Sequence, residues 1–274
     1  MYQLVRMPSL LARLPASVRS RRVAIWLGLA IALTVWLTRL PLFGVLGFEF
    51  ALVMAAFGSL CGVDLGAATI RRQRRAGGAE LAPTLAAAIG APVAIALVPL
   101  LLIATRGLWT RTCDPAFGVE AFAALALAST ALGAASGAAV ALVVGPRRWL
   151  GPVAPYLAVV VLIGLGVWRF RSEPPVFSFS PLVGFFPGNL YDEDIRLGAA
   201  LGWARLEQLA TVLTVLALVA ARYDRARVAL AWRGRAVAWR PAALAVVALA
   251  AAIGLRVNAG SLGYAIDADD IAAE

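Results

Sequence analysis

The stretch ALASTALGAASGAAVALVVG, residues 126–145, is 20 residues long and carries no charge. About 20 apolar residues in an α-helix are enough to cross the hydrocarbon core of a bilayer. Similar uncharged stretches recur along the 274-residue chain, which is 62% hydrophobic and has a mean hydropathy of +0.84. A soluble domain is only about half apolar and rarely contains such long runs. The sequence therefore predicts an all-α, polytopic membrane helix bundle.

The chain divides into three expected parts. Residues 1–22 carry five arginines among regularly spaced apolar residues, which is typical of a basic amphipathic segment on the membrane surface. Residues 257–274 form an acidic tail, either a short exported tail or the stub of a further exported domain. Between them we expect a transmembrane domain, residues 23–256, with about seven helices at 23–40, 45–70, 83–105, 117–144, 150–168, 199–221 and 238–256.

The orientation follows from the basic residues, all 25 of which are arginine. Most of them lie in the N-terminal segment and in the loops at 71–75, 147–148 and 222–240. Because basic loops are retained in the cytoplasm, we expect the N-terminus inside and the C-terminus outside, in a bacterial-type inner (plasma) membrane. A net charge of +10 in a soluble chain would suggest nucleic acid, but no nucleic-acid-binding motif accompanies it. We therefore expect no nucleic-acid partner.

The chain contains no histidine, which excludes Ser-His-Asp catalysis, HExxH zinc sites and histidine-ligated haem. The two cysteines, Cys61 and Cys113, are too few for a metal site and fall at opposite ends of their spans. We expect no catalytic residue, no metal and no cofactor.

The longest polar connection, residues 169–198, contains FFPGNLYDEDI at 185–195. Its aromatic residues and Pro-Gly pair favour a turn that dips into the headgroup region. Its acids would begin the next helix, where they face the positive end of the helix dipole. We expect this loop and the helix after it to form an outer contact surface, made of Tyr191, Asp192, Glu193, Asp194, Arg196, Arg205 and Glu207.

Other ionisable residues fall inside or at the ends of spans. Glu49, Glu120 and Glu207 each lie near the outer start of a helix. Either they form an outer polar layer together with Arg205, or they are ordinary acids that the helix dipole stabilises in a first turn. Asp64 lies deeper, before the arginines at 71–75. It either pairs with an inner arginine or lines a polar path. Only Ser59 is polar between Asp64 and Glu49, which favours the ion pair.

Small residues recur every four positions in the opening stretch, at Ser129, Gly133 and Gly137. Such a face allows close helix packing, either within the chain or between two copies. We favour packing within the chain, because a seven-helix bundle needs a central helix. The inner loop 222–241 mixes arginines with Trp232 and Trp239, which favours contact with anionic lipids at the cytoplasmic face over docking of a partner protein.

Two segments, CDPAFGVEAFAALALAST (113–130) and FFPGNLYDEDI, carry a resemblance. They resemble the N-terminal multi-span membrane region of bacterial proteins that carry an exported gluzincin-like peptidase domain, and the likeness extends over residues 40–266. It implies that the LYDE loop belongs to the outer face and that the tail leads into an exported domain. The peptidase motif HExxH is absent, so the resemblance transfers no activity to these residues.

The favoured function is a membrane anchor or scaffold that presents an exported C-terminal extension. The alternative is a permease-type subunit of a transporter. A closed centre packed with alanine and glycine would favour the anchor, and a continuous polar cavity would favour transport. A membrane enzyme would need two acids converging in a pocket.

Overall fold

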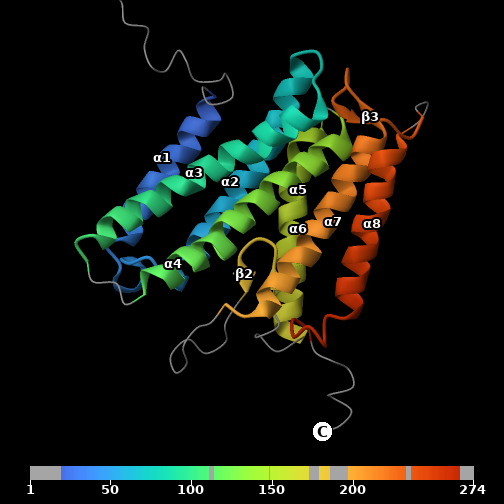
Figure 1. The fold of residues 1–274 in the computed structure, drawn as a ribbon. Helices are drawn as coiled ribbons and strands as arrows, with labels where there is room; N and C mark the ends of the chain where they lie inside the picture. The colour runs from blue at the N-terminus through green and yellow to red at the C-terminus, as the bar shows by residue number, and fades with distance from the viewer. Residues whose placement is uncertain are drawn as a thin grey trace, which may run out of the picture.

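The computed structural model describes residues 20–110, 114–147, 149–172, 179–185, 197–232 and 236–265. These residues form a bundle of helices with two short hairpins at its ends (Figure 1). The all-α prediction is confirmed. The helices are α1 Arg21–Leu37, α2 Phe48–Arg75, α3 Leu81–Gly107, α4 Pro115–Ala121, α5 Ala128–Val144, α6 Leu150–Ser172, α7 Ala199–Ala221 and α8 Trp239–Val257.

Helices α4 and α5 are one continuous rod, because the π-helix Phe122–Leu127 joins them. Asp114 caps the start of this rod, and its carboxylate accepts a hydrogen bond of 3.0 Å from the backbone N–H of Phe117. Counting the rod once, six helices are long and apolar enough to cross a membrane. A multi-pass membrane protein is therefore indicated.

Helix α1 is shorter than the predicted span 23–40. It ends at Leu37 and is followed by a 3₁₀ turn, Pro41–Phe43. Pro41 disfavours the helical conformation at the residue before it, Leu40. This explains why the apolar run does not continue as a helix to Leu40. Its 17 residues extend about 26 Å at ~1.5 Å per residue. The prediction of about seven transmembrane helices thus corresponds to six membrane-length helices and the slightly shorter α1.

Helices α2 and α5 form the centre of the bundle. In the most apolar 18-residue stretch of α2, 72% of the residues are buried, compared with 11% in α8. The two central helices are in backbone contact, since a Cβ added to Gly133 would lie 2.6 Å from the carbonyl oxygen of Ser59. A Cβ on Gly137 would collide with the carbonyl oxygen of Val63. The centre is therefore closed by direct helix-to-helix packing.

Helices α2, α5 and α7 end at what we call the arginine-rich end of the bundle, drawn at the top of Figure 1. A hairpin of Tyr223–Asp224 (β3) and Ala229–Leu230 (β4) covers this end. Arg74 fastens it, because its guanidinium donates to the carbonyl oxygens of Val228, Ala141 and Gly145 at 3.0, 3.0 and 2.8 Å.

A second hairpin, which joins α6 to α7 in the chain, lies toward the opposite end and packs against α2 and α6 (Figure 1). Its strands are Phe179–Ser180 (β1) and Gly184–Phe185 (β2), and Leu182 at its tip is buried against Val63 and Val159. Gly184 has a φ of +113°, and a side chain there would collide with Leu125. Only glycine allows this close return of the strand. The sequence predicted that the connection 169–198 lies on the outer face, and the structure inserts residues 179–185 of it into the bundle.

Candidate functional site

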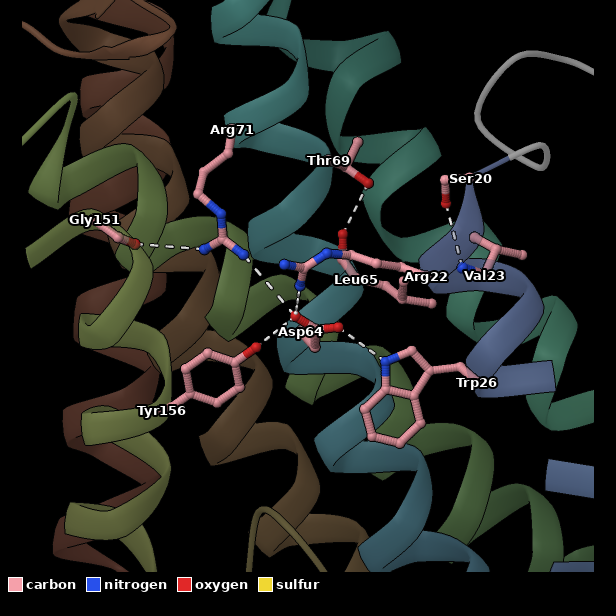
Figure 2. A network of polar contacts seen from close by, with 10 residues as sticks. All are labelled: Ser20, Arg22, Val23, Trp26, Asp64, Leu65, Thr69, Arg71, Gly151 and Tyr156. Atoms are coloured by element: carbon pink, nitrogen blue, oxygen red, sulfur yellow. Dashed lines mark hydrogen bonds and ion pairs between the residues drawn. The ribbon is translucent and has the colours of Figure 1, made fainter. Parts of the chain in front are cut away.

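Asp64, in the arginine-rich half of α2, is a buried carboxylate surrounded by several polar partners (Figure 2). Its carboxylate accepts hydrogen bonds from Arg22 Nη1 and Tyr156 Oη, both at 2.5 Å, and from Trp26 Nε1 at 2.9 Å. Arg71 Nη2 lies 3.9 Å from the same carboxylate. We call Asp64, Arg22, Trp26, Tyr156 and Arg71 the Asp64 cluster.

The Asp64 cluster joins three helices, since its donors come from α1 and α6 and the acid from α2. Arg71 adds a hydrogen bond of 3.4 Å from Nη1 to the carbonyl oxygen of Gly151, at the start of α6. Asp64 is 8% exposed at its side chain, whereas Arg22 is 54% exposed. The cluster therefore reaches from the packed interior to the surface of the arginine-rich end.

Three donors and a further guanidinium surround this one carboxylate, which limits its chemistry. Oδ1 already accepts from Arg22 and Tyr156, and Oδ2 accepts from Trp26, so only part of the acceptor capacity of Asp64 is left for a substrate proton. A buried acid held by two arginines fits a structural ion pair. Of the two alternatives for Asp64, the contacts favour pairing with inner arginines.

A second polar group surrounds Arg205 of α7, near the inserted hairpin. Its guanidinium donates to Ser129 Oγ at 2.6 Å, to Gln208 Oε1 at 3.0 Å and to the carbonyl oxygen of Pro181 at 3.3 Å. Its Nε is buried and has no hydrogen-bond partner among the described residues. Arg205 therefore ties α7 to α5 and to the hairpin.

The π-helix contributes to this second group. Leu125 lies within it, and its carbonyl oxygen is 3.5 Å from Nη2 of Arg205. A π-turn shifts the backbone hydrogen bonding of a helix by one residue and is frequent at functional positions. On the other side of the hairpin, Ser59 Oγ of α2 donates to the carbonyl oxygen of Leu182 at 2.5 Å. We call Arg205, Gln208, Ser129 and Ser59 the Arg205 cluster.

An apolar layer separates the two clusters. Val63 precedes Asp64 on α2, Val159 follows Tyr156 by one turn on α6, and both pack against Leu182 of the hairpin. All three side chains are less than 10% exposed. Asp64 and Ser59 are therefore not joined by a continuous polar path through the described residues.

The predicted outer polar layer is not assembled. Glu49 is half-buried in the first turn of α2, and Glu120 is exposed on α4. Within the part of the chain that the structure describes, no ion pair links Arg205 to Glu49, Glu120 or Glu207. Of the predicted packing face, Gly133 and Gly137 contact α2, and Ser129 binds Arg205.

Glu207 lines a different site, a cleft of about 290 Å³ between α6, α7 and the residues after α8. Gln208, Arg256 and Tyr264 also line it, and Glu207 is the one acid among the described lining residues. Burial, together with the nearby Glu207 carboxylate, raises the pKa of Tyr264 to about 12. Among the described lining residues, no second acid converges with Glu207 as in an acid–base pair.

Five residues of the predicted contact surface, Tyr191, Asp192, Glu193, Asp194 and Arg196, lie outside the described residues. The same holds for Cys113 and for most of the N-terminal segment and the tail, whereas Cys61 is buried as a free thiol. The structure adds Arg22, Trp26 and Tyr156, which the sequence analysis did not select. A signal existed for Arg22, since an arginine at the start of one span can reach an acid near the inner end of the next.

Comparison of the chain with protein-family models, with curated proteins and with solved structures finds no match. The geometry of the chain itself must therefore support any functional proposal.

Proposed function

We propose that the chain is an integral membrane anchor whose hairpin end faces outward and presents an exported C-terminal extension. The supporting observation is the closed centre: α2 and α5 touch at their backbones, and the layer of Val63, Val159 and Leu182 separates the two polar clusters. Such a centre suits a rigid support, and no continuous polar route crosses it through the residues that the structure describes.

At the hairpin end, the residues after α8 pack against the rest of the bundle. Phe179 of the hairpin meets Tyr264 edge to face, with ring centroids 6.2 Å apart. Tyr264 also donates to the carbonyl oxygen of Leu255 at 2.5 Å and packs with Ala204 of α7. The residues between α8 and Tyr264 thus pack against the hairpin and α7, and these contacts fix the position of Tyr264.

The orientation belongs to the same proposal. The arginine-rich end would lie in the cytoplasm of a bacterial-type cell, in contact with anionic lipids. The outer contact surface would comprise Tyr191, Asp192, Glu193, Asp194 and Arg196 together with Glu207. Its partner would be the exported extension, for which the resemblance suggests a gluzincin-like peptidase domain, or another exported protein.

A fusion experiment tests the anchor. A folded reporter is joined after Glu274 of the full chain, and intact spheroplasts are treated with a membrane-impermeant protease. We expect release of the reporter, whereas the same reporter inserted at Gly77, in the turn after α2, stays protected. Protection of the Glu274 reporter until the bilayer is broken would refute the orientation.

A permease-type subunit remains the second candidate, because Asp64 is an ionisable residue within a membrane helix and such residues often mark transport paths. Proteoliposomes containing the purified chain distinguish the two functions. The anchor predicts no ion or proton flux above that of empty vesicles. A flux that Asp64→Asn abolishes would favour the permease.

A further inference from the structure

A second cleft of about 290 Å³ opens at the arginine-rich end, between α1, α2 and α3. Five of the residues that line it are arginines from α1 and α2, namely Arg21, Arg22, Arg71, Arg72 and Arg75. Its remaining wall is largely apolar and includes Leu65, Ala68 and Ala91. The cleft thus combines a basic side with a hydrocarbon side.

The charges around this cleft are unbalanced. Asp64 is the acid next to it, and that carboxylate already pairs with Arg22 and Arg71. Among the described residues, Arg21, Arg72 and Arg75 take part in no ion pair. Residues 1–19, which lead into α1, contain no aspartate or glutamate, so that segment supplies no counter-ion. Among the described residues this positive charge is uncompensated, which favours the binding of an anion.

The start of α1 supports the same conclusion independently. Arg21 and Arg22 occupy its first turn, which contains no acid, and Ser20 caps it by accepting from the N–H of Val23 at 3.3 Å. The N-terminus of a helix carries partial positive charge, so arginines there are unfavourable and an anion is favourable. A bound anion would offset both the dipole and the arginines.

We propose that this cleft is a binding site for a phosphate group, and that its physiological ligand is the headgroup of an anionic phospholipid. Guanidinium groups bind phosphate oxygens through paired N–H donors. The apolar wall formed by Leu65, Ala68 and Ala91 lies beside the arginines in the same cleft, and an acyl chain would lie against it. Basic pockets between membrane helices are a known setting for such headgroups. This site does not depend on the anchor function, because it lies at the other end of the bundle.

The test measures lipid binding to the full chain. The chain is purified in a non-ionic detergent, stripped of lipid, and titrated with phosphatidylglycerol or with phosphatidylcholine of the same acyl chains, with bound lipid counted by native mass spectrometry. We expect phosphatidylglycerol to bind at least tenfold more tightly. Inorganic phosphate, added as a competitor to the chain with bound phosphatidylglycerol, distinguishes a free anion from a lipid as the ligand.

Paired variants locate the site. Arg21→Gln with Arg72→Gln removes two cleft arginines, and Arg225→Gln with Arg240→Gln removes two others from the same end of the bundle, outside the cleft. A surface arginine contributes about fivefold to anionic lipid binding, so we expect about 25-fold weaker binding for the first pair. The second pair should change binding by less than about threefold, because general surface attraction is its only contribution.

Three results would overturn the proposal: equal binding of the two lipids, equal losses in the two double variants, or displacement of phosphatidylglycerol by inorganic phosphate at equal concentration. The last result would assign the cleft to a soluble phosphate compound. If the first double variant does not fold, Arg75→Gln alone serves in its place, because Arg75 is exposed and lines the same cleft. Unchanged lipid binding in Arg75→Gln would then count against the site.

Discussion

Arg22 and Asp64 are 42 residues apart in the chain, yet the guanidinium of the first lies 2.5 Å from the carboxylate of the second. The pair joins the first turn of α1 to the arginine-rich half of α2. Helix α1 is the shortest of the long helices and packs mainly on α3, so this contact fixes its position relative to the central helix. The ion pair is thus a structural link between a peripheral helix and the core.

Asp64→Asn is expected to lower the stability of the fold. The amide cannot balance Arg22 and Arg71, which would leave two cations around a neutral group. Because Arg22 is half-exposed, the loss should be about 2 kcal/mol, below the ~3–5 kcal/mol that breaking a fully buried ion pair costs. Thermal unfolding in detergent measures it. Glu120→Gln, on an exposed acid, is the control and should leave the midpoint unchanged.

Substitution of glycines distinguishes packed from free helix faces. Gly137→Ala places a methyl group against the carbonyl oxygen of Val63, so α2 and α5 must separate, at a cost of about 1–3 kcal/mol. Gly164 of α6 has no atom within 4 Å of its added Cβ. Gly164→Ala should therefore be neutral or raise stability by up to about 1 kcal/mol, through helix propensity alone. Comparable unfolding midpoints for the two variants would contradict the close α2–α5 contact.

The fold was predictable because membrane helices are encoded by long apolar runs. The seven expected ranges correspond to α1, α2, α3, the α4–α5 rod, α6, α7 and α8, with small differences at the ends. The π-helix Phe122–Leu127 had no signal, since alanine, leucine and phenylalanine suit an ordinary helix equally well. Within the π-helix, the carbonyl oxygen of Leu125 accepts from Arg205 at 3.5 Å, a contact between distant segments.

The candidate site was predictable only in part. Asp64 stood out because acids are rare within membrane spans, and an arginine partner was expected. Tyr156 and Trp26 gave no signal, because aromatic residues are common near the ends of membrane helices. The insertion of Leu182 was hidden as well, since Phe179 and Ser180 alternate as they would in any surface strand. The positions of Tyr156, Trp26 and Leu182 depend on contacts between distant segments, which cannot be inferred from a single sequence.

Arg205→Gln tests whether one side chain holds the hairpin in the bundle. In a background of Cys61→Ala and Cys113→Ala, Leu182→Cys reports access to the hairpin tip, which is 7% exposed. Loss of the bonds to Ser129 and Pro181 should increase the rate of maleimide labelling at this cysteine by about tenfold or more. The control is Arg39→Gln, an exposed arginine before the 3₁₀ turn, which should not change the rate. Unchanged labelling in Arg205→Gln would mean that Ser59 and the apolar contacts hold the hairpin without it.

The attachment of the residues after α8 should weaken at alkaline pH. Tyr264 has a pKa of about 12 in the folded chain, against an ordinary value of 10.0, because burial and the Glu207 carboxylate disfavour its phenolate. The unfolded or detached segment therefore loses its proton first, and the stabilising contact is fully present below pH 10 and is lost between pH 10 and 12. A spin label at Ser261 should accordingly become more mobile over this range. In Tyr264→Phe the ring can still meet Phe179, but no proton is lost, so the label should show no transition there. A transition of equal size in both chains would assign the effect to another group, such as Tyr223.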